Sequence, residues 1–304
     1  MKRRTFSRLL TFLVAGTTAT SWSSSLADKK LTVIIDADTA NEIDDLYAIV
    51  RALLEPRFQV KGLCSAQWHN QLSPPNTVQE SQKLNEDLLR LMSRIDIPAP
   101  LGSEMIMGQP WGEYEGRNSP ATQLMIHTAR RMPANEKLII ISLGAATNVA
   151  SALKLAPDIM PKVICYNLGG HYDATKKIWN KDEFNVRNDL NAINFLFNTE
   201  GVDLHLMPIN ILYDFKFTLE EISKRLSGKG GVWDYLVTRW LSNAPGDKER
   251  IFWDLALMIA VARPDLAKEE KRLTPPENTQ REVSVYTQID VKGMINDWWK
   301  ITGK

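Results

Sequence analysis

The chain is poor in cysteine and carries almost no excess charge. Two cysteines, Cys64 and Cys165, occur in 304 residues, and each lies within an apolar, strand-like run. This excludes a dense disulfide framework and a cysteine-rich zinc site, and it favours buried core thiols, with a single bridge as the alternative. The formal net charge of +1 at pH 7 offers no broad electrostatic surface for nucleic acid or for a membrane.

Long apolar runs are also missing, and the short one at the N-terminus has the features of an export signal. Four basic residues within the first eight positions precede Leu9 to Gly16, an apolar segment too short to span a bilayer. Ser25-Leu26-Ala27 forms a small-x-small cleavage site, so residues 1–27 are predicted to be a signal peptide. The paired Arg3-Arg4 favours twin-arginine export over the Sec route, and we expect a periplasmic or secreted protein.

In the rest of the chain, short apolar runs alternate with amphipathic ones. Strands are predicted over residues 31–35, 59–65, 138–142 and 162–167, and helices over 43–54, 77–91, 146–155 and 190–198. Residues 218–240 are predicted to be helical with a break at 228–231, and 282–291 to form an edge strand or hairpin. Strands without alternation are buried on both faces, so the sequence predicts one α/β domain, 28–304, with an open, mostly parallel sheet and helices on both faces.

Acidic residues crowd the end of the first predicted strand. Five of them, Asp36, Asp38, Glu42, Asp44 and Asp45, occur within ten positions. Carboxylates gathered at the end of a buried strand must share a cation, share a proton or repel one another. A hard divalent cation is the simplest solution, and an acidic helix cap is the alternative.

Two further loops are predicted to meet this acidic segment. In an open α/β sheet, ligands bind beyond the carboxyl ends of the strands. Leu143-Gly144 and Gly169-Gly170 follow the third and fourth predicted strands, as the acidic segment follows the first. The sequence therefore predicts that three loops converge on one crevice.

Four short motifs follow one another along the chain in a specific order. They are Asp36-Ala37-Asp38 with Asp44-Asp45, then Leu143 to Ala150 with its Thr147-Asn148, then Glu183-Phe184-Asn185 with Asp189, and finally Trp253-Asp254-Leu255-Ala256. Taken singly, such motifs are also typical of helix caps, surface turns or core contacts. Together they resemble the motifs of the inosine-uridine nucleoside hydrolase family, in the form with two extra residues before the paired aspartates. The resemblance implies a Rossmann-like α/β fold and calcium-dependent hydrolysis of the N-glycosidic bond of nucleosides.

The resemblance also implies roles for individual residues. In the family pattern a Ca²⁺ is held by the residues that correspond to Asp38, Asp45, Asp254 and the carbonyl of Leu143. All four ligands are hard oxygens, which suits Ca²⁺ and leaves coordination positions for water and a sugar diol. Asp38 would also act as general base on the attacking water.

The remaining roles concern the sugar and the partners. Asp44, Glu183 and Asn185 would contact the ribose, while Asp36 would support the loop through backbone hydrogen bonds. The expected partner is a small-molecule nucleoside, with no nucleic acid and no membrane after signal cleavage. Family members are commonly dimers or tetramers, so a homo-oligomer is an option that the sequence leaves open.

The chain departs from the family pattern at the leaving-group acid. Better-known members carry a histidine where this chain has Trp253, and an indole cannot protonate a departing base. Trp253 is therefore a candidate for stacking on the base, and Trp179, Trp111 and Tyr114 are further candidates for a base-binding wall.

Two ribose-contacting positions also differ. The family often has Gly-Asn after the second strand, where this chain offers His69 and Asn70, and His69 is the histidine considered as proton donor. A family asparagine six residues before Glu-Phe-Asn is replaced by Lys177, and Asn180 is the nearby substitute.

Two other functions compete with nucleoside hydrolysis. A haloacid-dehalogenase-like phosphatase also places Asp-x-Asp at a strand end, but it would leave Asp44-Asp45 unexplained. An exported calcium-dependent protein that binds a ribosyl ligand without cleaving it would account for Trp253 in place of histidine.

Overall fold

Short apolar strands form the main sheet of the structure, a computed structural model that describes residues 30–303. They are β1 (Leu31–Ala37), β2 (Phe58–Ser65), β3 (Leu138–Ser142), β4 (Val163–Leu168), β7 (Asp203–Met207), β10 (Ala267–Leu273) and β11 (Glu282–Ile289). Their order is β10-β11-β7-β4-β3-β1-β2, with β10 antiparallel to β11 and the other neighbours parallel. The predicted open, mostly parallel α/β sheet is confirmed.

Helices and two small hairpins complete the described part of the chain. The hairpins are β5 (His171–Asp173) with β6 (Ile178–Asn180), and β8 (Lys216–Thr218) with β9 (Glu249–Ile251). The helices are α2 (Asp44–Leu54), α3 (Thr77–Leu91), α4 (Pro120–Arg130), α5 (Thr147–Leu155), α6 (Phe184–Asn188), α7 (Leu190–Asn198), α8 (Leu219–Leu226), α9 (Gly231–Asn243), α10 (Trp253–Ala262) and α11 (Val291–Thr302), with short 3₁₀ turns η1 (Pro157–Lys162), η2 (Ile209–Ile211) and η3 (Pro264–Leu266). Within residues 30–303, no helix is long and apolar enough to cross a membrane. The predicted signal peptide, residues 1–27, lies outside the described residues.

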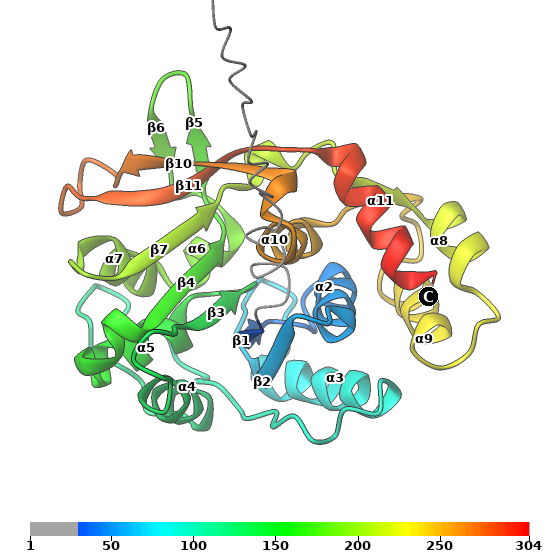
Figure 1. Cartoon of the computed structure of the whole chain (residues 1–304), viewed down its shortest axis with the longest axis horizontal. Helices are drawn as coiled ribbons and strands as arrows, with labels where there is room; N and C mark the ends of the chain where they lie inside the picture. The colour runs from blue at the N-terminus through cyan, green and yellow to red at the C-terminus, as the bar shows by residue number, and fades with distance from the viewer. Residues whose placement is uncertain (1–29, 304) are drawn as a thin grey trace, which may run out of the picture. The chain divides into compact units, whose positions relative to one another are not determined.

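Helices cover both faces of the sheet, which explains why its strands show no polar alternation. In β1, Val33 and Ile35 pack into a core shared with α2, α9, α10 and α11, whereas Ile34 faces a second core shared with α4, α5 and α7. All three side chains are fully buried. Figure 1 shows these two groups of helices on opposite sides of the strands. Successive side chains of a strand point to opposite faces, so a strand buried twice must be apolar throughout.

Most predicted elements are confirmed within a few residues, and α3, β3 and α7 have the predicted bounds. The predicted helix over 218–240 is divided into α8 and α9 at the expected glycines. Strand β11 pairs with β10 as a hairpin, but the prediction that it is an edge strand is wrong, because it lies between β10 and β7.

The two cysteines are buried core thiols. Cys64 lies in β2 and Cys165 in β4, and both are free and buried. Strands β1 and β3 lie between β2 and β4 in the sheet. Neighbouring strands are about 4.8 Å apart, so the two thiols are much too distant for a disulfide.

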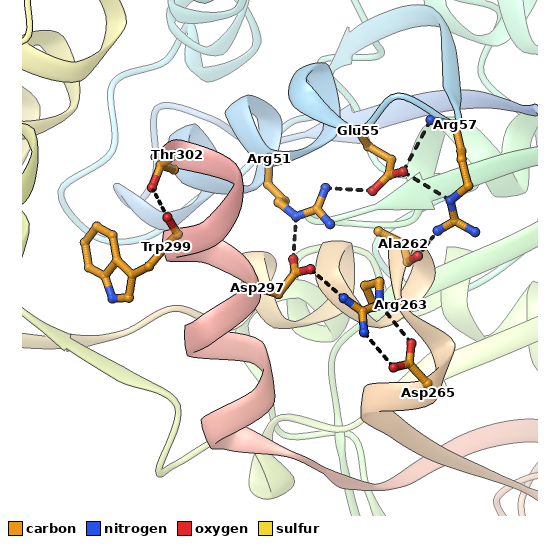
Figure 2. A network of polar contacts seen from close by, with 9 residues as sticks. All are labelled: Arg51, Glu55, Arg57, Ala262, Arg263, Asp265, Asp297, Trp299 and Thr302. Carbon is orange, nitrogen blue, oxygen red and sulfur yellow. Dashed lines mark hydrogen bonds and ion pairs between the residues drawn. The ribbon is translucent and has the colours of Figure 1, made fainter. Parts of the chain in front are cut away.

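A buried ion-pair network fixes the C-terminal helix to α2. Arg51 in α2 donates to Glu55 one turn later (3.0 Å) and to Asp297 in α11 (2.8 Å), and these side chains are 1%, 6% and 8% exposed. Arg57 donates to Glu55 and Arg263 donates to Asp297, each at 3.1 Å (Figure 2). Burial alone would raise the pKa of Glu55, but the charge of Arg51 and hydrogen bonds from Arg51 and Arg57 lower it below its ordinary value.

Removing the central guanidinium of this network should destabilise the fold. We expect Arg51→Ala to lower the free energy of unfolding by about 3 kcal/mol, because it leaves two buried carboxylates without their main partner. Arg90→Ala is the matched control, since it removes an ion pair with Asp87 from a guanidinium side chain that is 66% exposed. The control should change the same quantity by less than about 1 kcal/mol. Urea unfolding of both variants measures the difference, and equal losses would show that the network contributes no more than a surface pair.

Candidate active site

One cavity opens beyond the carboxyl ends of the central strands. Its volume is about 320 Å³, within the range of small-molecule sites. Side chains reach it from the loop after β1, the start of α2, the ends of β3 and β4, the hairpin β5–β6, the α6 region and the start of α10. The loops after β1, β3 and β4 therefore converge on one crevice, as the strand pattern predicts.

Three buried carboxyl groups meet at this cavity. Asp44 and Asp45 lie in the first turn of α2, and Asp254 lies in the first turn of α10. One oxygen of each lies within 4.8 Å of the others, and each residue is at most 5% exposed. The backbone N–H of Asp254 donates to Oδ2 of Asp44 (3.1 Å), which joins the two helix starts. Each helix N-terminus supplies a charge of roughly +0.5, which is too little to balance three carboxylates.

Burial is the main cause of a raised pKa at four aspartates of this region, Asp38, Asp44, Asp45 and Asp254. It raises the pKa of Asp44 to about 7, with the charge of Glu42 adding to the shift. It raises the pKa of Asp38 to about 8, with Asp44 adding to the shift. The pKa values of Asp45 and Asp254 are raised well above the ordinary range by burial and by neighbouring carboxylates. The site therefore resists ionisation unless positive charge enters it.

Three oxygens of the site lack a hydrogen-bond partner within residues 30–303. They are Oδ2 of Asp38, Oδ1 of Asp44 and Oδ1 of Asp45, and all three are buried. Buried polar atoms in folded proteins are normally paired, so three unpaired carboxylate oxygens on residues that line one cavity need an explanation. A hard cation accounts for them, because it takes oxygen ligands and offsets their repulsion. The residues present thus fit a bound divalent metal.

Asp38 lines the same cavity beside this group of three carboxylates. It is 2% exposed, and it lies so close to Gly144 that a Cβ added there would be 2.6 Å from its Oδ1. Glycine is therefore required at position 144 to admit the Asp38 carboxylate. The sequence assigns Asp38 to the metal and Asp44 to the sugar, whereas the closest group of oxygens in the structure includes Asp44.

The Glu-Phe-Asn motif forms one wall of the cavity. Glu183 caps α6, where its carboxylate accepts hydrogen bonds from the backbone N–H groups of Asn185 (3.1 Å), Val186 (3.1 Å) and Gly170 (3.0 Å). The side chain of Asn185 donates to the carbonyl of Leu143 (2.5 Å). That carbonyl keeps a second lone pair, so it remains able to bind a metal. Leu143, Glu183 and Asn185 all line the cavity, as the sequence predicts.

Hydrogen bonds between motifs hold the site together from behind. Thr147 donates to Asp189 (2.7 Å), which joins the second motif to the third. Asn148 donates to Oδ1 of Asp36 (2.9 Å), which joins the second motif to the first. The expectation that Asp36 supports the loop through backbone hydrogen bonds holds for its carbonyl, which accepts from the backbone N–H of Leu143 (2.8 Å), whereas its carboxylate is bonded by the Asn148 side chain. Burial raises the pKa of Asp36 to about 7.

Several sequence candidates do not line the cavity. Asn70 is exposed and stabilises its own turn by accepting from the N–H of Leu72 (2.8 Å). Asn180 is exposed and accepts from the N–H of Asp182 (2.7 Å). The His69 side chain is exposed. The structure thus provides no cavity contact for either proposed ribose-binding asparagine or for the proposed proton donor.

Among the aromatic candidates, only Trp253 lines the cavity. Its ring packs edge-on against Tyr213, with centroids 5.9 Å apart. Trp179 donates to the carbonyl of Leu273, Trp111 is 80% exposed, and Tyr114 packs on Phe195. Of these four candidates, Trp253 is therefore the one placed to meet a bound base, and Phe184 of the Glu-Phe-Asn motif is a further aromatic residue that lines the cavity.

Sequence reasoning missed other cavity residues that carry an ionisable side chain, namely His171, Asp182 and Arg187. His171 begins β5, directly after the Gly169-Gly170 turn that the sequence places at the crevice. Arg187 lies in α6, two residues beyond the Glu-Phe-Asn motif, and pairs with Asp182 (2.6 Å). Their adjacency to motifs already recognised is the signal that could have found them.

Comparison with known proteins agrees with this geometry. A model of the inosine-uridine preferring nucleoside hydrolase family matches residues 33–303. The pyrimidine-specific ribonucleoside hydrolase RihA of Salmonella typhimurium is 25% identical over 213 residues, which cover 64% of this chain and 65% of that protein. The match thus spans slightly less than two thirds of the length of this relative.

Solved structures of similar fold include two nucleoside hydrolases. The plant nucleoside hydrolase PpNRh1 aligns with a TM-score of 0.70 at 20% identity, over 90% of this chain and 99% of that chain. An inosine-uridine preferring nucleoside hydrolase from Bacillus anthracis aligns with a TM-score of 0.67 at 17% identity, over 89% of this chain and 98% of that chain. At these identities the likeness establishes the fold.

Proposed function

The chain belongs to the inosine-uridine preferring nucleoside hydrolase family, and from this we propose that it hydrolyses the N-glycosidic bond of ribonucleosides or related ribosyl compounds. One observation carries the proposal. Unpaired, buried carboxylate oxygens occur at the family's motif positions and line a cavity large enough for a small molecule. Family membership leaves the phosphatase interpretation without support.

Ca²⁺ is the cofactor that we propose for this site. Its ligands would be Asp38, Asp45, Asp254 and the carbonyl of Leu143, which are all hard oxygen donors. A Ca²⁺ bound there would supply the positive charge that keeps the carboxylates ionised, together with coordination positions for water and two sugar hydroxyls. The support is that Asp38 and Asp45 each keep a buried oxygen without a hydrogen-bond partner among residues 30–303, and that Asp45 and Asp254 belong to the group of three carboxylates that meet at the cavity. Metal ligands must be deprotonated, so a cation bound there would offset the cost of ionising these buried groups.

The protein's own side chains would then perform the hydrolysis. Asp38 would accept the proton of the water that attacks the anomeric carbon. Asp44, Glu183 and Asn185 would hold the ribose hydroxyls, so that sugar and water meet in attack geometry. As the base departs, positive charge develops on the sugar ring, and the carboxylate-lined wall would stabilise it electrostatically. Trp253 would stack on the base.

The biological setting is also proposed. The basic, apolar and small-residue order of residues 1–27 supports export to the periplasm or the medium, by the twin-arginine or the Sec route. An exported nucleoside hydrolase would scavenge external nucleosides for base and sugar. The partner would then be a small molecule. The protein would also form a homo-oligomer, as family members commonly do.

A second function is favoured by one specific residue. Trp253 occupies the position where the family resemblance implies a protonating histidine, and an indole is not an acid in water. A calcium-dependent ribosyl-binding protein would need no such acid. This alternative predicts binding without release of base.

A nucleoside panel distinguishes the two functions. We expect the purified protein to release base and reducing sugar from at least one ribonucleoside. This release should cease in excess chelator and should return when Ca²⁺ is restored. A binding protein would raise its melting temperature with the nucleoside but release nothing. Absence of both release and binding across the panel would contradict the proposed function.

A further inference from the structure

The cavity contains one histidine that neither the family pattern nor the sequence analysis assigns. The chain has four histidines, all within the described residues, and only His171 lines the cavity. His205 is held on both ring nitrogens, by Glu269 (2.6 Å) and Asp203 (3.3 Å), and so has a structural role. His69 and His127 are exposed outside the cavity.

The ring of His171 is not committed to the fold. Its Nδ1 is buried and has no hydrogen-bond partner within the described part of the chain. Buried polar atoms in folded proteins are normally paired, so the unpaired Nδ1 leaves this ring without a hydrogen bond that would tie it to the fold. With Nδ1 enclosed, Nε2 is the nitrogen available to a ligand in the cavity.

The fold brings His171 to the cavity on a different element from the carboxylates of the acidic group. The hairpin β5–β6 begins immediately after Gly170, whose φ of +72° is a conformation that favours glycine. The N–H of Gly170 donates to Glu183 (3.0 Å), which anchors the start of the hairpin to the ribose-binding wall. His171 therefore enters from β5, whereas the carboxylates enter from the β1 loop, α2 and α10.

No other side chain of the cavity is suited to protonate a leaving group. Arg187 keeps its proton at any physiological pH, and the indole of Trp253 is not an acid. The Glu42 carboxylate pairs with Arg250 (2.6 Å), and Asp182 pairs with Arg187 (2.6 Å). The Glu183 carboxylate accepts three backbone N–H groups. The remaining acids are the carboxylates already proposed for Ca²⁺, water and sugar.

We propose that His171 is the general acid that protonates the departing base, in place of the histidine that Trp253 replaces. This assignment rests on the proposed function. The C–N glycosidic bond breaks with its electron pair going to the base, and the imidazolium form of His171 gives the proton on Nε2 to an acceptor atom of that base, which leaves a neutral imidazole with its proton on Nδ1. The attacking water forms the new C–O bond and loses a proton to Asp38. One proton is given and one is taken, so solvent exchange restores both residues.

Two leaving groups test the assignment. A nucleoside base departs poorly as an anion and needs a proton, whereas para-nitrophenolate departs readily without one. We expect His171→Gln to lower kcat for inosine or uridine by about 10²-fold or more. The same variant should keep kcat for para-nitrophenyl riboside within about threefold of wild type, because general acid catalysis adds little there. His171→Asn should show the same split, and His69→Gln is the matched control that should change neither rate.

Each possible result of this experiment either supports or overturns the role of His171. Loss of nucleoside cleavage with retention of para-nitrophenyl riboside cleavage supports the proposal and also shows that the variant is folded. Equal losses on both substrates, or no loss on either, would overturn the role of His171 while leaving the proposed function intact. If wild type cleaves neither substrate in the presence of Ca²⁺, the proposed function itself fails and the assignment falls with it.

Discussion

Asp38→Asn is expected to lower kcat for a cleaved nucleoside by about 10³-fold, the largest effect of any conservative change in the cavity. The amide cannot accept a proton from water, although its oxygen can still bind a hard cation. The packing should survive, because the amide has nearly the size of the carboxylate that Gly144 accommodates. Ca²⁺ should therefore still raise the melting temperature of the variant, at a higher concentration than for wild type.

The matched control for this change is Asp158→Asn. Asp158 is 57% exposed and pairs with Arg130 outside the cavity, so the same chemical change should leave kcat unaltered. Steady-state rates at saturating nucleoside and Ca²⁺ measure the effect. If the Asp38 variant bound Ca²⁺ and kept kcat within tenfold of wild type, Asp38 would not be the general base.

Asp254→Ala should separate metal binding from folding. The change removes one proposed ligand, so Ca²⁺ should no longer stabilise the protein at concentrations that stabilise wild type by about 2.7 kcal/mol, which corresponds to 100 times Kd. Activity should fall by at least about 10²-fold at that Ca²⁺ concentration, as is typical when metal affinity is lost. Thermal unfolding with and without Ca²⁺, together with the rates, measures both effects.

The pH dependence of stability, measured on metal-free wild type and metal-free Asp254→Ala, provides a second test. Burial raises the pKa of Asp44 to about 7 and that of Asp38 to about 8. Groups whose pKa is raised by folding contribute stability that is fully present below the unfolded value and is lost as pH rises through the folded value. Metal-free wild type should therefore lose stability as pH rises from about 4, the ordinary pKa of an aspartate, to about 8, the pKa of Asp38 in the folded protein. Asp254→Ala should lose less, because one repelling carboxylate is gone, and an equal or larger loss would argue against a shared acidic cluster.

The buried parts of the fold could be predicted from sequence because their pattern is determined locally. The β3 sequence, Leu138 to Ser142, is apolar throughout because it is buried on both faces, and its bounds were predicted without error. Helix α3 likewise follows its amphipathic pattern from Thr77 to Leu91. In both cases the periodicity of the strand or helix determines which side chains are buried, so the sequence pattern of the segment is enough to predict it.

Other elements depend on context that the sequence does not display. Strand β10, with the sequence AKEEKRL, was not predicted because five of its seven residues are charged. It lies at the edge of the sheet, where charged side chains reach water and discourage pairing with other chains. Helix α4 was also missed, although Ser119 caps it and Pro120 opens it, which is a recognisable start signal.

The residues of the candidate site show the same contrast between positions fixed by regular elements and positions that depend on loops. The loops after β1, β3 and β4 were placed together because the parallel sheet fixes the carboxyl ends of its strands, whereas Asp254, in the first turn of α10, was placed with Asp45 only by the family resemblance. Asn70 and Asn180 were assigned by motif position, but they belong to loops whose course depends on contacts made elsewhere. His171 was overlooked for the same reason, because the turn at Gly169-Gly170 decides where the hairpin leads.

The central claim is that side chains from both halves of the chain hold one Ca²⁺ in the cavity. The most direct test is a crystal soaked in Ca²⁺ and measured for anomalous scattering. The account predicts one strong peak in contact with the carboxylates of Asp38, Asp45 and Asp254 and with the carbonyl of Leu143. No peak among these residues, at Ca²⁺ concentrations that support hydrolysis, would contradict it.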